Sequence, residues 1–363
     1  MKFTIQKSEL TKYIGIAQRA ISNRSSIQIL EGIVFETRGN ELILSSTDLE
    51  LSVNTRVACD VQEEGSLVLK SEIVGNIVRK MPNDLITFNG NAESVKITCQ
   101  NSKFDLKAQD SMDYPSLPDP VDEVTLTMDA IELKEALHET IFATSIDETW
   151  LALTGVLFSQ KSDCLEFVGL DGYRMAIKKF DYRSTENETI IPKRALNELS
   201  KIIEDGKVDI TMAKGHVIFT TGNTKMYTRV IDKKYIDYEK IVSTNNKIKL
   251  TVNRDDLLSS LERASLLASG GEISLSKFSI SDGVINIHSK SELGEIEENI
   301  SCQQIGDDIN ISFNTRYVIE GIKAINDDKL TIYLNEPLNP MIIHPFSDEN
   351  SYLYLVLPVR TSA

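Results

Sequence analysis

Two aspartates in similar surroundings are the residues of this sequence that most suggest chemistry. Asp48 lies in Ser-Thr-Asp-Leu-Glu-Leu and Asp171 in Leu-Asp-Gly-Tyr, each after a run typical of a strand. Two carboxylates can act together as general acid and general base. These two, however, lie in different copies of the internal repeat described below, so they would not share one site. We therefore interpret each as a turn residue whose carboxylate accepts backbone N–H groups.

No other set of residues indicates catalysis or metal binding. The four histidines have no cysteine or carboxylate at catalytic or metal-ligand spacing, and no nucleophile-elbow, Walker or dinucleotide-binding glycine motif occurs. The cysteines are dispersed, without a C-x-x-C pair, which favours reduced, buried thiols over a zinc site or disulfides; they are Cys59, Cys99, Cys164 and Cys302. We expect no catalytic residue, no metal site and no cofactor.

Six segments have apolar residues at helical spacing and lie among alternating runs typical of strands, such as 41–53, 164–177 and 284–290. The predicted helices are 7–20, 70–80, 131–145, 193–203, 253–268 and 315–325. Starts at 7, 131 and 253 are 124 and 122 residues apart, and starts at 70, 193 and 315 are 123 and 122 apart. A constant period indicates copies of one unit. The sequence therefore predicts an α+β protein of three similar domains.

Two segments without periodicity predict the domain boundaries. Segment 113–120 contains three of the nine prolines, and segment 238–247 is polar with no helical pattern, so we interpret both as linkers. The predicted domains are 1–120, 121–246 and 247–363, with net charges of −3, −5 and −7.

The net charge of the 363-residue chain is −15, which argues against a surface covered with basic residues. The six predicted helices, however, hold 14 Lys or Arg against 10 Asp or Glu, a net charge of +4 that leaves −19 for the rest. Helices gathered on one surface would make that surface mildly basic, although ordinary solvated helix faces also explain the count. No run approaches the ~20 apolar residues of a membrane span, and the first ten residues alternate apolar and polar types, so we expect a cytoplasmic protein.

Seven motifs spread over all three predicted domains resemble the bacterial DNA polymerase III β subunit, the sliding clamp family. They are the opening MKFTI, NRSSIQIL at 23–30, STDLEL at 46–51, LTGVLF at 153–158, LDGYRMA at 170–176, FNTRY at 313–317 and YLVLPVR at 354–360. The resemblance implies three repeated clamp domains, each with two helices packed on antiparallel sheets. It also implies a head-to-tail homodimer, closed into a six-domain ring around duplex DNA, that serves as a processivity factor and not as an enzyme. Alternatives are a diverged clamp copy with a specialised partner and a three-domain enzyme, which would need a polar site that we do not find.

A clamp that slides along DNA needs diffuse attraction to the phosphates and no recognition of base edges. By resemblance, Arg24 matches a family position that touches DNA. The other expected contacts are the helical cations Lys12, Arg19, Arg79, Lys80, Lys193, Arg194 and Lys201. Trp150 lies in a loop, 146–152, where the family usually has an arginine. It could stack on an exposed base, contact a partner or cap the core of the central domain.

The resemblance further implies a groove between the second and third domains for short Gln- and Leu-rich peptides of the polymerase, the clamp loader, other polymerases and repair proteins. Matching positions are Leu153, Leu170, Gly172, Tyr173, Arg174, Met175, Ile236, Lys240, Ile241, Met341, Val356, Leu357, Pro358, Val359 and Arg360. Methionine and aliphatic side chains can repack around different anchors, and Arg174 or Arg360 can donate to a peptide backbone. Each apolar member could instead belong to a core. Tyr173, Ile236 and the extension 361–363 depart from the family pattern and should tune peptide preference.

A ring interface has candidates in the first and third predicted domains. Phe104 and Leu106 lie on an alternating run expected to be an edge strand, and Leu266 and Leu267 end a predicted helix. The charged candidates are opposite in sign at the two ends of the chain: Lys96, Lys103 and Lys107 against Glu292, Glu295, Glu297 and Glu298. Opposite charge at two different patches favours a heterologous contact. Exposed ion pairs are worth about 0 to 1 kcal/mol each, so the apolar residues should supply most of the affinity.

Overall fold

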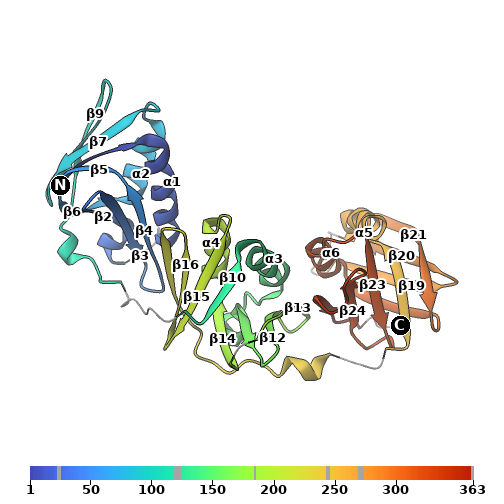
Figure 1. Cartoon of the computed structure of the whole chain (residues 1–363). Coiled ribbons are helices and arrows are strands. Elements are labelled where there is room, and N and C mark those ends of the chain that lie inside the picture. Colours follow the sequence, from blue (N-terminus) through green and yellow to red (C-terminus); the bar gives the residue numbers. More distant parts are fainter. Residues whose placement is uncertain (23–25, 118–123, 184, 243–245, 269–273, 361–363) are drawn as a thin grey trace. The chain divides into compact units, whose positions relative to one another are not determined.

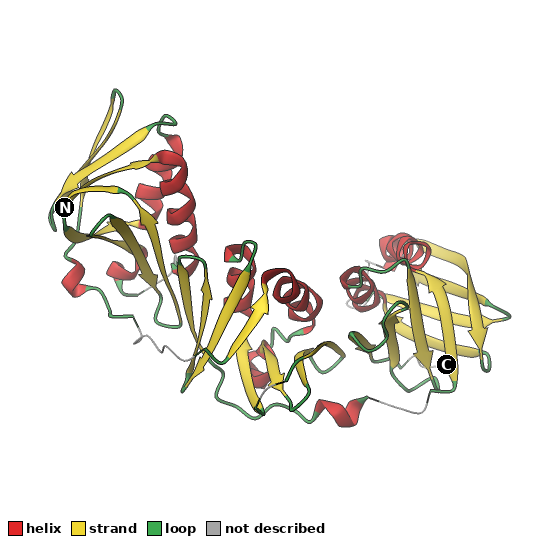
Figure 2. Ribbon diagram, in the orientation of Figure 1, coloured by secondary structure: helices red, strands yellow, loops and turns green. Residues whose placement is uncertain are grey.

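A computed structural model describes residues 1–22, 26–117, 124–183, 185–242, 246–268 and 274–360 (Figure 1). The chain divides into two compact units, which are described separately. Unit 1 comprises Met1–Lys134 and Arg194–Val230, and unit 2 comprises Glu135–Lys193 and Ile231–Ala363. Both units consist of antiparallel sheets with helices packed against them (Figure 2).

Each of the six α-helices in the described residues begins directly after a strand. The pairs are β1 (Lys2–Gln6) and α1 (Lys7–Ala17), β6 (Gly65–Lys70) and α2 (Ser71–Lys80), β10 (Leu126–Asp129) and α3 (Ala130–Thr140), β14 (Asn187–Pro192) and α4 (Lys193–Ile202), β18 (Ile248–Asn253) and α5 (Arg254–Ala268), and β22 (Ile309–Asn314) and α6 (Thr315–Ala324). All six predicted helices are thereby confirmed. The predicted ends at 18–20 and 141–143 are 3-10 turns.

Apolar spacing explains why these segments are helical and which face is buried. In α1, Leu10, Ile14 and Ala17 recur every three to four residues, and each is almost completely buried. They pack into the core of unit 1 beside Phe3 and Phe88, whose stacked rings have centroids 4.8 Å apart. The opposite face of such a helix is left for charged side chains.

The described part of unit 1 contains two sheets. A five-stranded sheet has the order β5-β1-β7-β8-β9, and an eight-stranded sheet has the order β10-β15-β16-β17-β4-β3-β2-β6. The remaining strands are β2 (Gly32–Arg38), β3 (Glu41–Thr47), β4 (Leu51–Ala58), β5 (Asp60–Glu63), β7 (Leu85–Gly90), β8 (Ser94–Cys99), β9 (Ser102–Lys107), β15 (Lys207–Ala213), β16 (His216–Thr221) and β17 (Thr224–Arg229). The β4–β17 ladder joins segments far apart in the sequence, because Thr55 lies opposite Thr224.

In unit 2 the described strands form one continuous twelve-stranded sheet. Its order is β14-β11-β12-β13-β25-β24-β23-β18-β21-β20-β19-β22. The remaining strands are β11 (Gly155–Gln160), β12 (Cys164–Leu170), β13 (Arg174–Asp181), β19 (Leu275–Ser281), β20 (Val284–Ser291), β21 (Gly294–Ile305), β23 (Lys329–Leu334), β24 (Met341–Pro345) and β25 (Tyr352–Val356). The β13–β25 ladder places Arg174 opposite Val356, which joins the turn after β12 to the C-terminal segment.

Two expectations need correction, those on the strand-like runs and on the burial of the thiols. The runs 41–53 and 164–177 are each two strands around a turn, β3–β4 and β12–β13. Each predicted linker has a buried tyrosine near its start. The Tyr114 hydroxyl donates to the Gly32 carbonyl at 3.1 Å. Tyr238 begins a 3-10 turn, Tyr238–Ile241, and its hydroxyl donates to Glu166 at 2.5 Å. All four thiols are free, but Cys59 and Cys302 are only half-buried. None of the helices in the described residues has the length and apolar character needed to cross a membrane.

Candidate functional site

A surface pocket of about 840 Å³ lies in unit 2, where several separate segments converge. Its walls come from the segment after α3, from the β12–β13 turn and from the first turns of α4 and α6. The lining residues are Phe142, Thr144, Ser145, Ile146, Asp147, Trp150, Leu153, Asp171, Gly172, Tyr173, Arg174, Lys193, Ile236, Arg316, Tyr317 and Glu320. We call this site the partner pocket.

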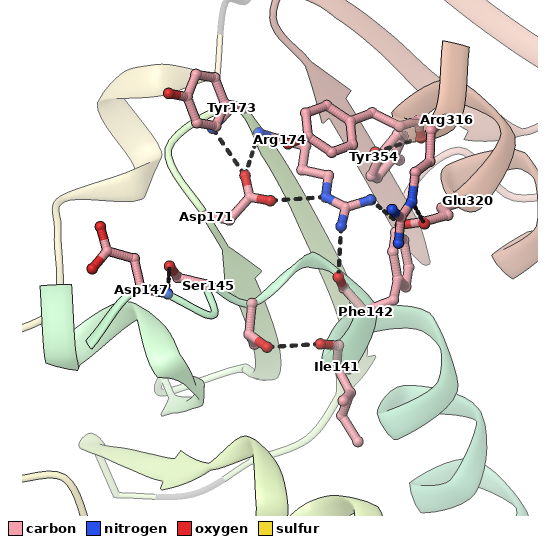
Figure 3. Close-up of polar contacts among 12 residues, drawn as sticks. Ile141, Phe142, Ser145, Asp147, Asp171, Tyr173, Arg174, Arg316, Glu320 and Tyr354 are labelled. Carbon is pink, nitrogen blue, oxygen red and sulfur yellow. Dashed lines mark hydrogen bonds and ion pairs between the residues drawn. The ribbon is translucent and has the colours of Figure 1, made fainter. Parts of the chain in front are cut away.

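Arg174 is the structural centre of the partner pocket (Figure 3). Its Nε donates to Asp171 Oδ2 at 2.9 Å, its Nη2 donates to the Phe142 carbonyl at 2.9 Å, and its Nη1 is paired with Glu320. The guanidinium also lies 4.4 Å from the ring centroid of Tyr317. Each of the three guanidinium nitrogens of Arg174 thus has one partner within the chain, and its contact with a peptide backbone stays a prediction.

The aspartate turns are confirmed. Asp171 Oδ1 accepts the backbone N–H groups of Tyr173 and Arg174 at 2.9 and 3.0 Å. Asp48 Oδ1 likewise accepts those of Glu50 and Leu51, at 3.1 and 2.8 Å. The two turns share a backbone conformation as well, because the residue after each aspartate has a positive φ.

That φ is +89° at Gly172 and +80° at Leu49. In both turns the second carboxylate oxygen is paired with an arginine, Arg174 for Asp171 and Arg194 for Asp48. Each carboxylate is therefore a structural group that orders a turn and orients an arginine.

Large exposed apolar side chains line the mouth of the partner pocket. Trp150 and Tyr173 are 62% and 63% exposed, and Ile236 is 39% exposed. Trp150 therefore does not cap a core, which removes one of its three predicted roles. Exposed aromatic and aliphatic surface around a concave site is typical of a binding site for an apolar ligand segment.

The predicted groove residues fall into three groups in this structure. Five line the partner pocket: Leu153, Gly172, Tyr173, Arg174 and Ile236. Four form an apolar cluster with Leu153 and are buried or half-buried: Leu170, Met175, Ile241 and Leu357. The remaining six lie elsewhere: Met341 and Val356 in the other core of unit 2, the half-buried Pro358 and Val359, and the exposed Lys240 and Arg360.

Two predicted groove residues therefore have a different role. Met175 is completely buried, and Met341 is 2% exposed, so neither forms the adaptable surface that we expected. Conversely, Phe142, Asp147, Arg316, Tyr317 and Glu320 belong to the pocket but were not predicted. The motif FNTRY at 313–317 already contained Arg316 and Tyr317, and its two polar or aromatic side chains were the signal that could have identified them.

The predicted DNA-binding cations are mostly paired with carboxylates of the same unit. Lys12 Nζ lies 2.8 Å from Glu204, whose hydrogen bond raises the pKa of Lys12. Glu198 accepts from Arg19 at 3.3 Å and from Lys201 at 2.8 Å. Nine of the 14 helical cations are in ion pairs within the described residues, so fewer of them are free to attract phosphates. They are Lys12, Arg19, Lys70, Arg194, Lys201, Arg254, Arg263, Arg316 and Lys323.

Three predicted DNA contacts have other surroundings. Arg79 is exposed and donates to Asn76 at 2.7 Å and to Gln18 at 3.2 Å, and Lys80 is exposed. Lys193 is half-buried and lines the partner pocket, while its contact with DNA stays a prediction. Arg24 lies outside the described residues.

The ring-interface candidates include two open strand edges. Strand β9 is the last strand of its sheet and pairs only with β8 among the described strands; it carries Phe104, 39% exposed, and the half-buried Leu106. Within the described strands, residues 294–301 of β21 pair with β20 alone, because the β18 ladder reaches only residues 302–305.

Most of the predicted interface side chains near these edges are exposed. Leu266 is 74% exposed and Leu267 is half-buried, while Lys96, Lys103 and Lys107 are exposed, as are Glu292, Glu295 and Glu297. Glu298 is half-buried like Leu267, and Arg263 donates to both of its oxygens at 2.7 Å and lowers the pKa of the carboxyl. The charge of Glu298 is therefore compensated within the chain.

Three family models together account for nearly the whole chain. The DNA polymerase III beta subunit N-terminal domain matches residues 1–118, the central domain matches residues 127–237, and the C-terminal domain matches residues 239–360. The chain belongs to the DNA polymerase III β subunit family. It is 31% identical to the beta sliding clamp of Staphylococcus epidermidis, with 99% of this chain and 100% of that protein covered.

Solved β-subunit structures have the same fold. The DNA polymerase sliding clamp of Bacillus subtilis superposes with a TM-score of 0.96 at 29% identity, covering 100% of both chains. The β subunit from the DNA polymerase of Streptococcus pyogenes gives a TM-score of 0.96 at 26% identity, covering 99% of this chain and 100% of that one. The sequence expectation of a repeated clamp fold is thereby confirmed.

Proposed function

We propose that this chain is a DNA sliding clamp, an accessory processivity factor and not an enzyme. It closes a ring around duplex DNA as a head-to-tail homodimer and tethers the DNA polymerase III catalytic subunit, the clamp loader and other polymerases and repair proteins. The observation that carries the proposal is the match of all three β-subunit domain models, in order, along one chain. A cytoplasmic location accords with this role, because bacterial chromosomes are replicated there.

The proposed domains are 1–120, 121–246 and 247–363. Support comes from the family matches to 1–118, 127–237 and 239–360. The six strand-to-helix junctions also support it, since two of them fall in each proposed domain.

The proposed ring interface joins β9 of one chain to residues 294–301 of β21 in its partner. Unpaired strand edges promote association, and pairing these two would satisfy their backbone groups. Exposed Phe104 and Leu266 would supply apolar area, and the lysines beside β9 would face the glutamates beside β21. Two different patches meet in this contact, so it is heterologous, and it must close after two copies to give a ring.

The proposed contact with DNA is diffuse. Arg79 and Lys80 are exposed without a carboxylate partner in the described residues, and the paired cations Lys12, Arg19, Arg194 and Lys201 give a weakly attractive surface. Weak, sequence-independent attraction suits a protein that slides, because phosphate contacts carry no base information. We further propose that the partner pocket receives the tethering peptide, with Trp150 contacting the partner.

Retention on primed circular DNA tests the proposal. The protein is loaded by a bacterial clamp loader of proven activity on its own clamp, and the complex is isolated before and after the circle is cut. A clamp stays on the circle and is lost through free ends. Retention on linear DNA would indicate direct binding instead, and failure to load would favour a diverged copy with another partner.

A further inference from the structure

Lys193 is the cation of the partner pocket that lacks a counterion among the described residues. Its ammonium group has no hydrogen bond or ion pair with any residue that the structure describes, although the residue is half-buried at the start of α4. The other two cations of the pocket are paired, Arg174 with Asp171 and Glu320 and Arg316 with Glu320 at 2.7 Å. The pocket therefore contains one cation whose charge is partly desolvated and uncompensated.

The surroundings of Lys193 provide little negative charge to compensate its ammonium group. Burial and the guanidinium of Arg174 lower its pKa, and the opposing influence of Glu320 and Asp171 is smaller. Both carboxylates are already engaged by arginines, which explains why they do little for Lys193. A ligand carboxylate next to the ammonium group would supply the missing charge in a partly dry site, where a charge-assisted hydrogen bond is strong.

Asp147 is the other lining charge without an ionic partner in the part of the chain that the structure describes, but its situation differs. Its side chain is exposed, and hydrogen bonds from the side chain and the backbone N–H of Thr149 lower its pKa; the N–H donates to Oδ1 at 2.9 Å. The carboxylate of Asp147 is therefore open to solvent and hydrogen-bonded to the backbone, so it does not need a cationic ligand to compensate its charge.

Apolar surface lies in the same pocket as Lys193. Trp150, Tyr173 and Ile236 are all more than one third exposed, and Leu153 forms part of the wall. One lysine among aromatic and aliphatic side chains complements a segment that combines apolar side chains with one negative charge.

Resting on the proposed clamp function, we infer that Lys193 is a specificity residue of the partner pocket and recognises an aspartate or glutamate side chain placed among the apolar residues of a partner peptide. The occupant is thus an acidic-apolar peptide segment. In this role Lys193 binds the peptide ligand directly and does not serve as a DNA-facing cation.

Fluorescence polarisation with a positional set of peptides tests the inference. The probes are labelled, end-capped pentapeptides based on Gln-Leu-Asn-Leu-Leu, in which aspartate is placed at each position in turn, with asparagine at the same position as the neutral comparison. With the full-length protein, at least one aspartate peptide should bind about tenfold more tightly than its asparagine counterpart. Lys193→Met should abolish that ratio while leaving the affinity of the asparagine peptide nearly unchanged.

Lys234→Met is the matched control, because Lys234 is exposed and does not line the pocket. It makes the same change in net charge and should preserve the ratio. Equal binding of aspartate and asparagine peptides at every position would overturn the inference. A gain seen only with an uncapped C-terminal carboxylate would overturn it too, since the ligand would then be a chain end. If no peptide binds and the circular-DNA experiment also fails, the clamp function itself is wrong.

Discussion

Replacing Glu198 and Glu204 with glutamine should make duplex DNA bind more tightly and more salt-dependently. These two carboxylates hold three helical cations: Glu204 pairs with Lys12 at 2.8 Å, and Glu198 pairs with Arg19 at 3.3 Å and with Lys201 at 2.8 Å. All five side chains belong to unit 1. Removing the carboxylate charges leaves the three cations free to contact phosphates, if the helices face DNA as we propose.

The magnitude follows from counterion release. Each added phosphate contact steepens the dependence of log K on log salt by about 0.9, so three cations give about 2.7 per chain. A fourfold rise in salt concentration should therefore weaken DNA binding by both proteins, and the factor of weakening should be about 40 times larger for the double variant than for the parent protein. The ion pairs that are lost join exposed or half-buried side chains at the surface and are worth about 0 to 1 kcal/mol each, so the fold should survive.

Fluorescence anisotropy with a labelled duplex is measured over a range of potassium chloride concentrations. It gives the slope of log K against log salt concentration for the parent protein and for the double variant. The matched control is Glu93→Gln with Glu186→Gln, which makes the same change in net charge at exposed carboxylates that form no ion pair in the described residues. The control should shift the slope little. Parallel slopes for the parent protein and the Glu198/Glu204 variant would refute the reasoning, because they would mean that Lys12, Arg19 and Lys201 do not reach phosphates.

Two further predictions concern stability, measured by urea unfolding. Gly321→Ala should destabilise the protein by about 2 to 3 kcal/mol, because its Cβ would lie 2.1 Å from the buried ring of Tyr354. Gly15→Ala, with open space around its Cβ, should stabilise α1 by about 0.5 to 1 kcal/mol, and equal effects at the two sites would contradict this packing argument. Burial raises the pKa of Glu139 from 4.5 to about 7 despite its pairing with Lys178, so its contribution to stability is complete below pH 4.5 and is lost as the pH rises through 7. Glu139→Gln should flatten that loss between pH 5 and 8, and an unchanged pH profile would show that another group causes it.

Local pattern was enough to predict the repeated elements. The apolar residues of α1 recur at helical spacing, and a helix needs only neighbours along the chain to form. The Asp48 and Asp171 turns were predicted for the same reason, because each carboxylate binds N–H groups two and three residues ahead. The edge position of β9 followed from its alternating, charged run. These features depend mainly on residues that are close together in the sequence, so residue type and spacing are enough to predict them.

Only the tertiary structure decided which charges are free and which surfaces are accessible. Lys193 and Arg194 are adjacent in the sequence, yet one lines the partner pocket and the other is paired with Asp48. Lys12 meets Glu204 across 192 positions of sequence, a contact that no local spacing encodes. Met175 matched a groove position but is completely buried. Burial and ion pairing result from the packing of segments that are remote in sequence, and these determine where this protein can bind a partner.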